Sequence, residues 1–327
     1  MSKMSNNIQI NKYLRIFVFL CILLPNFLHA QETRVNFSYR TYISAGTAEL
    51  TFFEDNLYIS GNTNSPIDQT AIDNFSTAHS GVVGYVGIYI NDNGWESGRY
   101  FSGSNSQENF IHEFGSNKSI YLAGLVRGNA EILNAFDNTY GTGASDGYIA
   151  KLDSNYNLLW ATYWGGDNLE VIKDIALDSE ENLIVVGSTF GSTTGISNNG
   201  FQNVYGGNRD GMIAKYDKNG NQLWASYYGG NGEDQAFGVD VDENDDLYIC
   251  GYTSSSNQIY ENGFQNSLNG VYDAFIAKFD SQGNRIWGTY YGGTGNDQFR
   301  EIKLKDDNIF LSGQSSSTDV IGENGFN

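Results

Sequence analysis

Apolar and polar positions alternate with a period of two along most of the chain, in short runs rich in β-branched and aromatic residues. This pattern predicts short β-strands, because successive side chains of a strand point to opposite faces. In one stretch it predicts four consecutive strands, at Phe237–Asp242, Leu247–Thr253, Ala274–Asp280 and Arg285–Tyr291. Gly, Asn, Asp and Ser separate the strands, as in "SQGN", and such residues favour tight turns. Long helical patterns are absent after the first thirty residues, so the fold class is all-β.

One segment of sequence occurs three times in closely similar form. "DGYIAKLDSNYNLLWATYWGG" begins at Asp146, "DGMIAKYDKNGNQLWASYYGG" at Asp210 and "DAFIAKFDSQGNRIWGTYYGG" at Asp273. Consecutive copies are 64 and 63 residues apart. A fainter copy, "GYVGIYINDNGWESGRYFSG", occupies 84–103 and has Ser97 in the place of the repeated Trp. A fixed period of this length indicates a repeat architecture, in which each copy is one supersecondary unit.

Four antiparallel strands in each copy, repeated about an axis, describe the blades of a β-propeller. The predicted organisation is a leader at 1–30, an N-terminal strand within 31–47 and propeller repeats over 48–327. Residues 39–43, "YRTYI", resemble the fourth strand of the repeat, "WATYW", so this strand is a candidate to close the ring by completing the last blade. The repeats divide at about 48–103, 104–166, 167–230, 231–293 and 294–327. The last of these ends in mid-repeat, since "IGENGFN" matches "IYENGFQ" inside the preceding copy. We therefore expect a fragment of four blades and half of a fifth, with the missing blades supplied by the rest of the reading frame.

The repeated pattern D-[AG]-x-I-A-K-x-D-x-x-G-N-x-x-W-x-x-Y-x-G-G resembles the bacterial β-propeller repeats called SBBP, for seven-bladed β-propeller. The likeness covers roughly residues 48–327 and is strongest from Asp146 onward. It implies an extracytoplasmic propeller, commonly part of a large secreted or surface protein of Bacteroidetes-like bacteria that carries a C-terminal sorting domain. The chain departs from the pattern in the first copy, which lacks the Trp and the Gly pair, and it contains no sorting domain.

The first thirty residues predict a secretory signal peptide. Lys3, Lys12 and Arg15 precede the apolar run Ile16–Leu24, and Ala30 provides a small residue for cleavage before Gln31. Nine apolar residues are too few to cross a bilayer, which takes about 20. The predicted location is therefore outside the cell or at its surface, without a transmembrane segment after cleavage.

The charge of the chain limits the classes of partner it can bind, and its cysteine content limits the disulfides it can form. The formal net charge is −20 with 38 acidic and 18 basic residues, and loss of the basic leader makes the mature chain more negative. Nucleic-acid binding depends on clustered Lys and Arg, so this class of partner is excluded. Cys250 would be the one cysteine after cleavage, so no internal disulfide is expected, and it is predicted to be a buried apolar residue.

Residues that recur at fixed places in the repeat are interpreted as structural. They are Trp160, Trp224 and Trp287; Gly166, Gly230 and Gly293; and Asp146, Asp210 and Asp273. Asp234 and Asp297, with Glu170 equivalent, are weak candidates for binding Ca²⁺, which takes six to eight oxygen ligands. The alternative, which repetition favours, is that each carboxylate caps backbone N–H groups. No other cofactor is predicted.

Catalytic residues are not predicted. Glu54, Asp55, Glu131 and Asp137 depart from the repeat, but nothing in the sequence pairs them as acid and base. The Tyr and Trp doublets at the end of the repeat, such as Tyr227–Tyr228, are expected to pack between blades; the alternative exposes one ring of each for stacking on a sugar.

The strand order predicts that the long connections between the second and third strands gather on one face, around the mouth of a central channel. Such insertions commonly carry binding functions. Two hypotheses follow. The first is a noncatalytic extracellular propeller that binds or displays a glycan or protein. The second is a propeller-based polysaccharide hydrolase or lyase, or the accessory domain of one.

Overall fold

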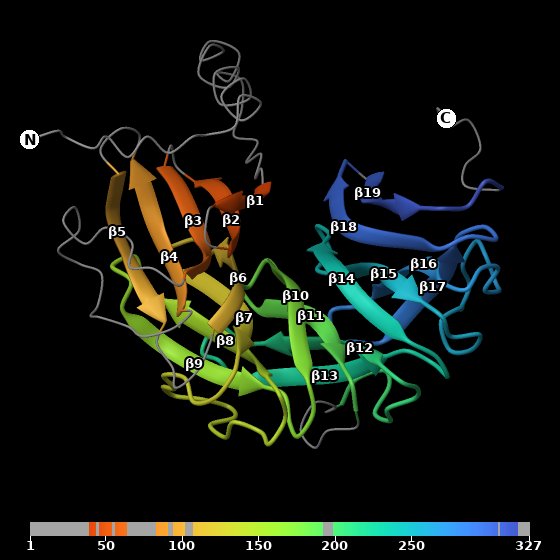
Figure 1. Ribbon diagram of the computed structural model, residues 1–327, viewed down its shortest axis with the longest axis horizontal. Coiled ribbons are helices and arrows are strands. Elements are labelled where there is room, and N and C mark those ends of the chain that lie inside the picture. Colours follow the sequence, from red (N-terminus) through yellow and green to blue (C-terminus); the bar gives the residue numbers. More distant parts are fainter. Residues whose placement is uncertain are drawn as a thin grey trace, which may run out of the picture. The chain divides into compact units, whose positions relative to one another are not determined.

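The computed structural model describes residues 39–43, 46–53, 56–63, 83–90, 94–101, 107–191, 199–306 and 308–319 (Figure 1). The chain divides into two units, Met1–Phe37 and Ser38–Asn327, and all described residues belong to the second. The predicted signal peptide therefore lies outside the described residues.

The described residues form five antiparallel sheets whose strands follow one another in chain order. The first sheet contains β1 (Tyr39–Ile43), β2 (Gly46–Phe53), β3 (Asn56–Thr63), β4 (Val83–Ile90) and β5 (Gly94–Phe101). The second contains β6 (Gln107–Phe114), β7 (Ile120–Val126), β8 (Asp146–Leu152) and β9 (Leu158–Trp164). The third contains β10 (Glu170–Leu177), β11 (Leu183–Thr189), β12 (Asp210–Tyr216) and β13 (Gln222–Tyr228). The fourth contains β14 (Asp234–Val241), β15 (Leu247–Thr253), β16 (Asp273–Phe279) and β17 (Arg285–Tyr291), and the fifth contains β18 (Asp297–Lys305) and β19 (Asn308–Ser315).

This arrangement confirms the predicted fold class, an all-β chain built of four-stranded antiparallel blades. The four strands predicted over 237–291 agree with β14 to β17 within a few residues at each end. Along each blade the first strand is called the inner strand and the fourth the outer strand.

The N-terminal strand pairs with the strand that follows it. Residues 39–43 form β1, and β1 pairs with β2, with Ile43 opposite Gly46. Only two residues separate the two strands. A connection that short favours local antiparallel pairing, because it costs little loop-closure entropy. β1 thus extends the first sheet at its edge.

The second, third and fourth sheets repeat the same irregularities in strand pairing. The inner strand bulges against the second strand, between Ile172 and Asp174 in the third sheet and between Ala236 and Gly238 in the fourth. A second bulge follows the repeated Lys of the third strand, as at Lys215 and Tyr216. Bulges increase local twist and redirect side chains. Their recurrence shows that the repeat specifies the blade in detail.

The long connections do not lie wholly at a channel mouth, as the strand order suggested. Large parts of them lie along the outer strand: the carbonyl oxygen of Gln202 accepts a hydrogen bond from the N–H of Tyr227, and that of Gln265 accepts one from the N–H of Tyr290. The isolated bridges Leu133–Ala161 and Asn199–Ala225 lie on the same outer strands. An outer strand otherwise presents unpaired N–H and C=O groups, so these segments protect the edge. These parts of the connections lie away from the predicted face. Their ends, at Ser145, Arg209 and Tyr272, lie beside the links between blades, as the strand order predicted.

The hydrophobic cores lie between consecutive sheets. One core joins Ile111 and Tyr121 of the second sheet to Val185 and Met212 of the third, and another joins Val186 of the third to Phe275 of the fourth. The central strands β7, β8, β11 and β12 are buried at every position. Both faces of the second and third sheets are covered by neighbouring sheets, so these strands bury apolar side chains on both sides.

Carboxylates also join the inner strands of successive sheets. Asp174 on β10 accepts a hydrogen bond from the N–H of Val239 on β14 at 3.0 Å. Asp240 on β14 accepts one from the N–H of Leu304 on β18 at 2.7 Å. The third sheet is thus tied to the fourth, and the fourth to the fifth, at their inner edges as well as through apolar packing.

Candidate functional site

The repeated Trp joins each blade to the turn of the next. Trp160 Nε1 donates a hydrogen bond to the carbonyl oxygen of Lys218 at 3.1 Å, and Trp224 Nε1 donates one to that of Ser281 at 3.2 Å. Each accepting residue lies in the turn between the third and fourth strands of the following sheet. The Trp residues thus serve inter-blade contact.

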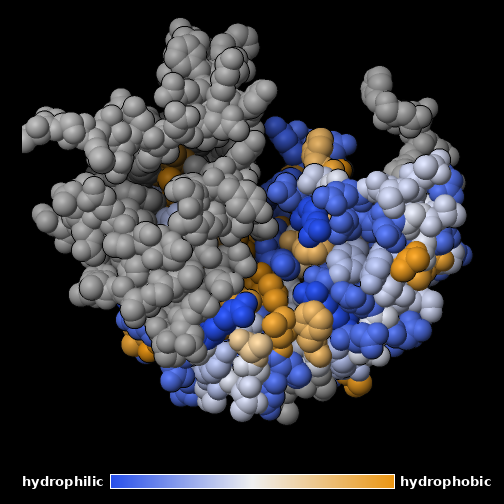
Figure 2. Space-filling model, viewed as in Figure 1, coloured by the Kyte–Doolittle hydropathy of each residue, from blue (hydrophilic) through white to orange (hydrophobic). Residues whose placement is uncertain are grey.

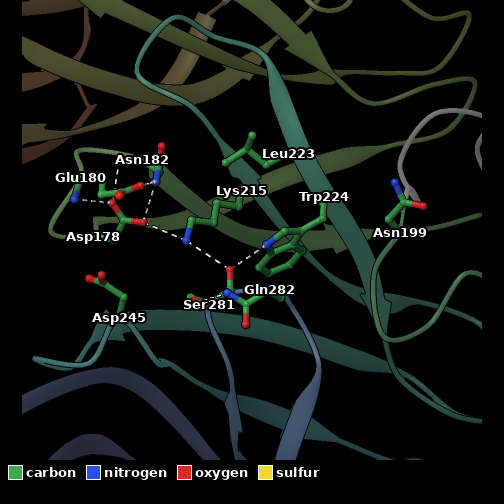
Figure 3. Close-up of a pocket in the computed structure, with 10 residues that line it drawn as sticks. All are labelled: Asp178, Glu180, Asn182, Asn199, Lys215, Leu223, Trp224, Asp245, Ser281 and Gln282. Carbon is green, nitrogen blue, oxygen red and sulfur yellow. Dashed lines mark hydrogen bonds and ion pairs between the residues drawn. The ribbon is translucent and has the colours of Figure 1, made fainter.

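The carbonyl oxygen of Ser281 also accepts a hydrogen bond from a second donor, Lys215. Lys215 Nζ lies 3.2 Å from the carbonyl oxygen of Ser281 and 2.8 Å from Asp178 Oδ2 (Figure 3). Lys215 and Asp178 are both buried. Burial acts to raise the pKa of Asp178, but hydrogen bonds from Lys215 and Asn182 outweigh it and hold that pKa below its usual value.

These groups line an open groove between the third and fourth sheets with a volume of about 470 Å³. Figure 3 shows Trp224 and Lys215 converging on Ser281, with Asp245 and Glu180 nearby. A corresponding groove lies between the second and third sheets and includes Lys151 and Lys218. Both grooves lie at the end of the sheets that carries the short turns, opposite to the end where the sequence predicted a binding face.

Two carboxylates lie on either side of the first glycine of each Gly pair. A Cβ at Gly229 would lie 2.6 Å from Asp234 Oδ2 and 2.9 Å from Asp210 Oδ1. At Gly292 the corresponding distances are 2.7 Å to Asp297 Oδ2 and 2.9 Å to Asp273 Oδ1. Any side chain there would displace a carboxylate, so the repeat requires glycine. Asp146 and Glu170 are placed in the same way around Gly165.

The repeated carboxylates accept backbone hydrogen bonds. Gly230 N–H donates to Asp234 Oδ2 at 2.9 Å, and Gly293 N–H donates to Asp297 Oδ2 at 2.9 Å. Asp146 accepts from the N–H of Gly141 at 2.8 Å, and Asp210 accepts from that of Gly206 at 2.7 Å. The backbone N–H of the second glycine of each pair therefore donates a hydrogen bond to a repeated carboxylate. This bond explains why Gly166, Gly230 and Gly293 recur at one position of the repeat.

Burial raises the pKa of these carboxyls. It raises the pKa of Asp146 and of Asp210 to about 6, and that of Glu170 to about 7. The neighbouring Asp234 carboxylate adds to the shift at Asp210. Burial also raises the pKa of Asp234 and of Asp273. Two carboxyls in one buried site disfavour double ionisation.

The Ca²⁺ candidates are already engaged by protein donors. Ser255 Oγ donates to Asp234 Oδ2 at 2.6 Å, and Thr253 donates to Oδ1. Ser317 Oγ donates to Asp297 Oδ2 at 2.6 Å, and Ser315 donates to its Oδ1. Among the residues that the structure describes, no group of three or more His, Cys, Asp or Glu is placed to hold a metal ion.

The other residues that the sequence singled out fall into structural roles. Tyr163, Trp164, Tyr227 and Tyr228 are all buried, so both rings of these two doublets pack inside and neither is free for a sugar. Glu131 forms an ion pair with Arg99 at 2.6 Å, and Asp137 accepts a hydrogen bond from the N–H of Thr139. Glu54 and Asp55 lie outside the described residues. Cys250 is buried, as expected.

One group of side chains, most of which depart from the repeat, lies at the opposite end of the sheets from the grooves. It comprises Phe190, Arg209, Glu233, Gln235, Tyr252 and Tyr272, here called the Glu233 cluster. Glu233 directly precedes the inner strand β14, and Tyr252 is near the end of β15. Arg209 directly precedes β12, and Tyr272 directly precedes β16. These positions place the cluster at one edge of the third and fourth sheets.

Glu233 is the centre of this cluster. Its Oε1 accepts hydrogen bonds from Tyr252 Oη at 2.8 Å and from Gln235 Nε2 at 3.2 Å. Its Oε2 accepts one from Tyr272 Oη at 3.3 Å. Arg209 Nη1 lies 3.7 Å from Oε1, which is an ion pair but too long for a hydrogen bond. The Glu233 side chain keeps 31% of its surface exposed, so the carboxylate is held in place and still open to solvent.

Arg209 connects the carboxylate to an exposed ring. Its Nε and Nη2 donate to Ser188 Oγ at 3.0 and 2.8 Å, and its guanidinium carbon lies 4.2 Å from the centre of the Phe190 ring. Phe190 is 47% exposed. The Glu233 carboxylate raises the pKa of Tyr272, so this phenol stays protonated and donates. The arrangement thus combines aromatic surface with fixed donors and an acceptor.

The sequence reasoning missed this cluster because its members are far apart in the chain. The signal was present: in the repeat, Glu233 stands where neighbouring copies have Leu169 and Asn296, and Tyr272 stands where another has Ser145. A comparison of the residue types at equivalent positions of the copies would have identified Glu233 and Tyr272. It would not have shown that they share a hydrogen bond.

Comparison with known proteins agrees with the blade architecture. Residues 223–257, which include β14, β15 and most of β13, match the family described as "Beta-propeller repeat" (SBBP). The chain is also similar to the "Uncharacterized WD repeat-containing protein L264" of Acanthamoeba polyphaga mimivirus, with 33% identity over 149 residues. That similarity covers 42% of this chain and 11% of the viral protein. Fold and comparisons together support a β-propeller protein built of this repeat.

The described surface is mixed in polarity. Figure 2 shows hydrophilic residues over most of the described part of that face, with apolar residues in small separate groups. Exposed apolar side chains include Phe190, Val204, Phe264 and Val271. Among the described residues, no helix has the length and apolar character needed to cross a membrane.

Proposed function

We propose that this chain is a noncatalytic extracellular β-propeller that acts as a binding or display module at a bacterial cell surface. Its ligand would be a glycan or a protein, and it would reach its location through cleavage of the leader 1–30. The leader pattern and the resemblance to SBBP repeats support the location.

The Glu233 cluster is the observation that carries the proposal. Trp224, Asp210 and Gly230 recur in the other blades and are occupied in holding strands and sheets together. Glu233, Tyr252 and Tyr272 do not recur, and they form a connected polar site on a repeated scaffold. Function in repeat proteins resides in positions where one copy differs from its neighbours, because a shared framework leaves those positions free to vary.

A combined binding and turnover assay tests the proposal. The purified chain is incubated with mixed polysaccharides, and new reducing ends and unsaturated products are measured beside retention on immobilised glycans and capture of surface proteins. Binding without turnover is the expected result. Turnover would replace the proposal by the second hypothesis, a polysaccharide hydrolase or lyase.

Export is tested separately. Expression of the full chain in a Gram-negative host, followed by N-terminal sequencing of the extracytoplasmic product, should give a protein that begins at Gln31. A product that keeps Met1 and stays in the cytoplasm would contradict the proposed location.

A further inference from the structure

We infer that the Glu233 cluster is a binding site for an uncharged saccharide; this inference rests on the proposed binding function. The site offers the groups that a sugar ring uses: an exposed aromatic ring at Phe190, a carboxylate at Glu233 and a guanidinium at Arg209. A sugar hydroxyl is one donor and two acceptors, so it is matched by a site that presents both kinds of partner.

The two charged groups lie side by side without a direct hydrogen bond between them. Arg209 Nη1 and Glu233 Oε1 are 3.7 Å apart, beyond direct hydrogen-bond range. Polar groups at such a distance are commonly bridged by one water molecule. A ligand hydroxyl beside this pair can accept a hydrogen bond from Arg209 and donate one to Glu233. The bond from Tyr272 to Oε2 holds the carboxylate in position for it.

The charge of the site selects an uncharged ligand. Arg209 and Glu233 compensate each other, and the whole chain carries a formal net charge of −20. An acidic sugar would meet a repulsive field without a free cation to bind. A neutral saccharide loses no charge solvation on binding and uses the directional hydrogen bonds.

The site is also ordered before any ligand binds. Arg209 is fixed by Ser188 and by Phe190, and Glu233 is fixed by Tyr252, Gln235 and Tyr272. Groups that are already in place lose less conformational entropy on binding. The cluster is compact, which suits one or two sugar rings better than a protein interface of about 800 Å² per partner.

The repeat itself supplies a variant that should fold. Glu233→Asn and Tyr272→Ser place at these positions the residues that Asn296 and Ser145 provide at equivalent positions of other blades. The blade framework already accommodates both residues. The matched control is Glu243→Asn with Tyr260→Ser, which makes the same chemical changes at two exposed positions outside the cluster.

The experiment is affinity electrophoresis of the wild-type chain and both double variants in gels containing mannan, xylan or mixed-linkage β-glucan, with polygalacturonate as the acidic comparison. We expect retardation of the wild-type chain in at least one neutral gel. The Glu233/Tyr272 variant should lose at least about tenfold in affinity, because it lacks a charge-assisted hydrogen bond, while the control is unchanged. Melting curves and the isosteric variant Glu233→Gln distinguish lost binding from lost folding.

The inference is overturned if no neutral polysaccharide retards the wild-type chain, if the acidic one binds better, or if the Glu233/Tyr272 variant binds as well as the control. Loss of protein capture in that variant, without glycan binding, would overturn the saccharide assignment and leave the proposed binding function in place. Turnover of the polysaccharide would instead contradict the proposed function.

Discussion

The indole N–H of Trp224 donates a hydrogen bond to the carbonyl oxygen of Ser281, 57 residues further along the chain and in the next sheet. Trp160 makes the equivalent bond to Lys218. The repeated Trp is therefore part of the contact between blades, and its recurrence follows from the recurrence of that contact. These bonds also mean that the Trp of one blade stabilises the turn of the following blade.

Replacing Trp224 by Ala should destabilise the chain by about 3–5 kcal/mol. The substitution leaves a cavity between the third and fourth sheets and removes one donor to Ser281. Urea unfolding followed by circular dichroism gives the free energy. Leu223→Ala is the control, since Leu223 is adjacent and 44% exposed, and it should cost below about 1 kcal/mol. Equal costs for the two variants would contradict the role given to the indole.

The turn that receives this indole should not tolerate a side chain. Gly283 has φ of +86°, and a Cβ there would lie 2.8 Å from Cδ2 of Trp224. Gly283→Ala should therefore lower stability by about 1–3 kcal/mol, through backbone strain and through displacement of the ring. Gln282→Ala, one residue away and exposed, should change it little. A neutral or stabilising Gly283→Ala would show that the ring is free to move.

The buried pair of Lys215 and Asp178 gives a third prediction. Lys215→Met leaves the buried carboxylate of Asp178 without its cation, and loss of one partner of a buried pair costs about 3–5 kcal/mol. Thermal melts compare this variant with Lys218→Met, which alters an exposed lysine of the same sheet. The prediction fails if both variants melt at the same temperature.

Stability should fall as the pH rises from about 5 to 8. The folded-state pKa of Asp146 and Asp210 is about 6 and that of Glu170 about 7, all above the values of exposed carboxyls. The folded chain therefore binds more protons than the unfolded chain in this pH range, so the free energy of unfolding decreases as the pH rises. This contribution is fully present below about pH 4 and is lost as the pH passes through the folded-state pKa values.

Acidification below about pH 4 should lower the stability of the folded chain. The pKa of Asp178 is held below its usual value, so its contribution is present above about pH 4 and is lost on further acidification. A stability maximum at mildly acidic pH is expected from melts between pH 3 and 9. Glu170→Gln should flatten the slope between pH 5 and 8, whereas Glu180→Gln, at an exposed position, should keep it. An unchanged slope in Glu170→Gln would contradict the assignment to this carboxyl.

The sequence by itself determined the blades. Alternation of apolar and polar residues defined β14 to β17 within a few residues, and the spacing of Trp160, Trp224 and Trp287 gave the repeat. This information is local: strand periodicity and turn residues act over a few positions, and a blade is a meander of sequential strands. A repeat also shows the same local solution several times, which reduces the effect of any single irregular copy.

Only the tertiary structure decided which residues meet. The outer position of the long connections depends on bonds such as that from Tyr227 to Gln202, and the carboxylate pairs depend on the close approach of Asp210 and Asp234 around Gly229. The link from Glu233 to Tyr272 spans 39 residues. Such contacts arise from the packing of whole sheets, which brings distant positions to one edge, and no local pattern of polarity encodes that distance.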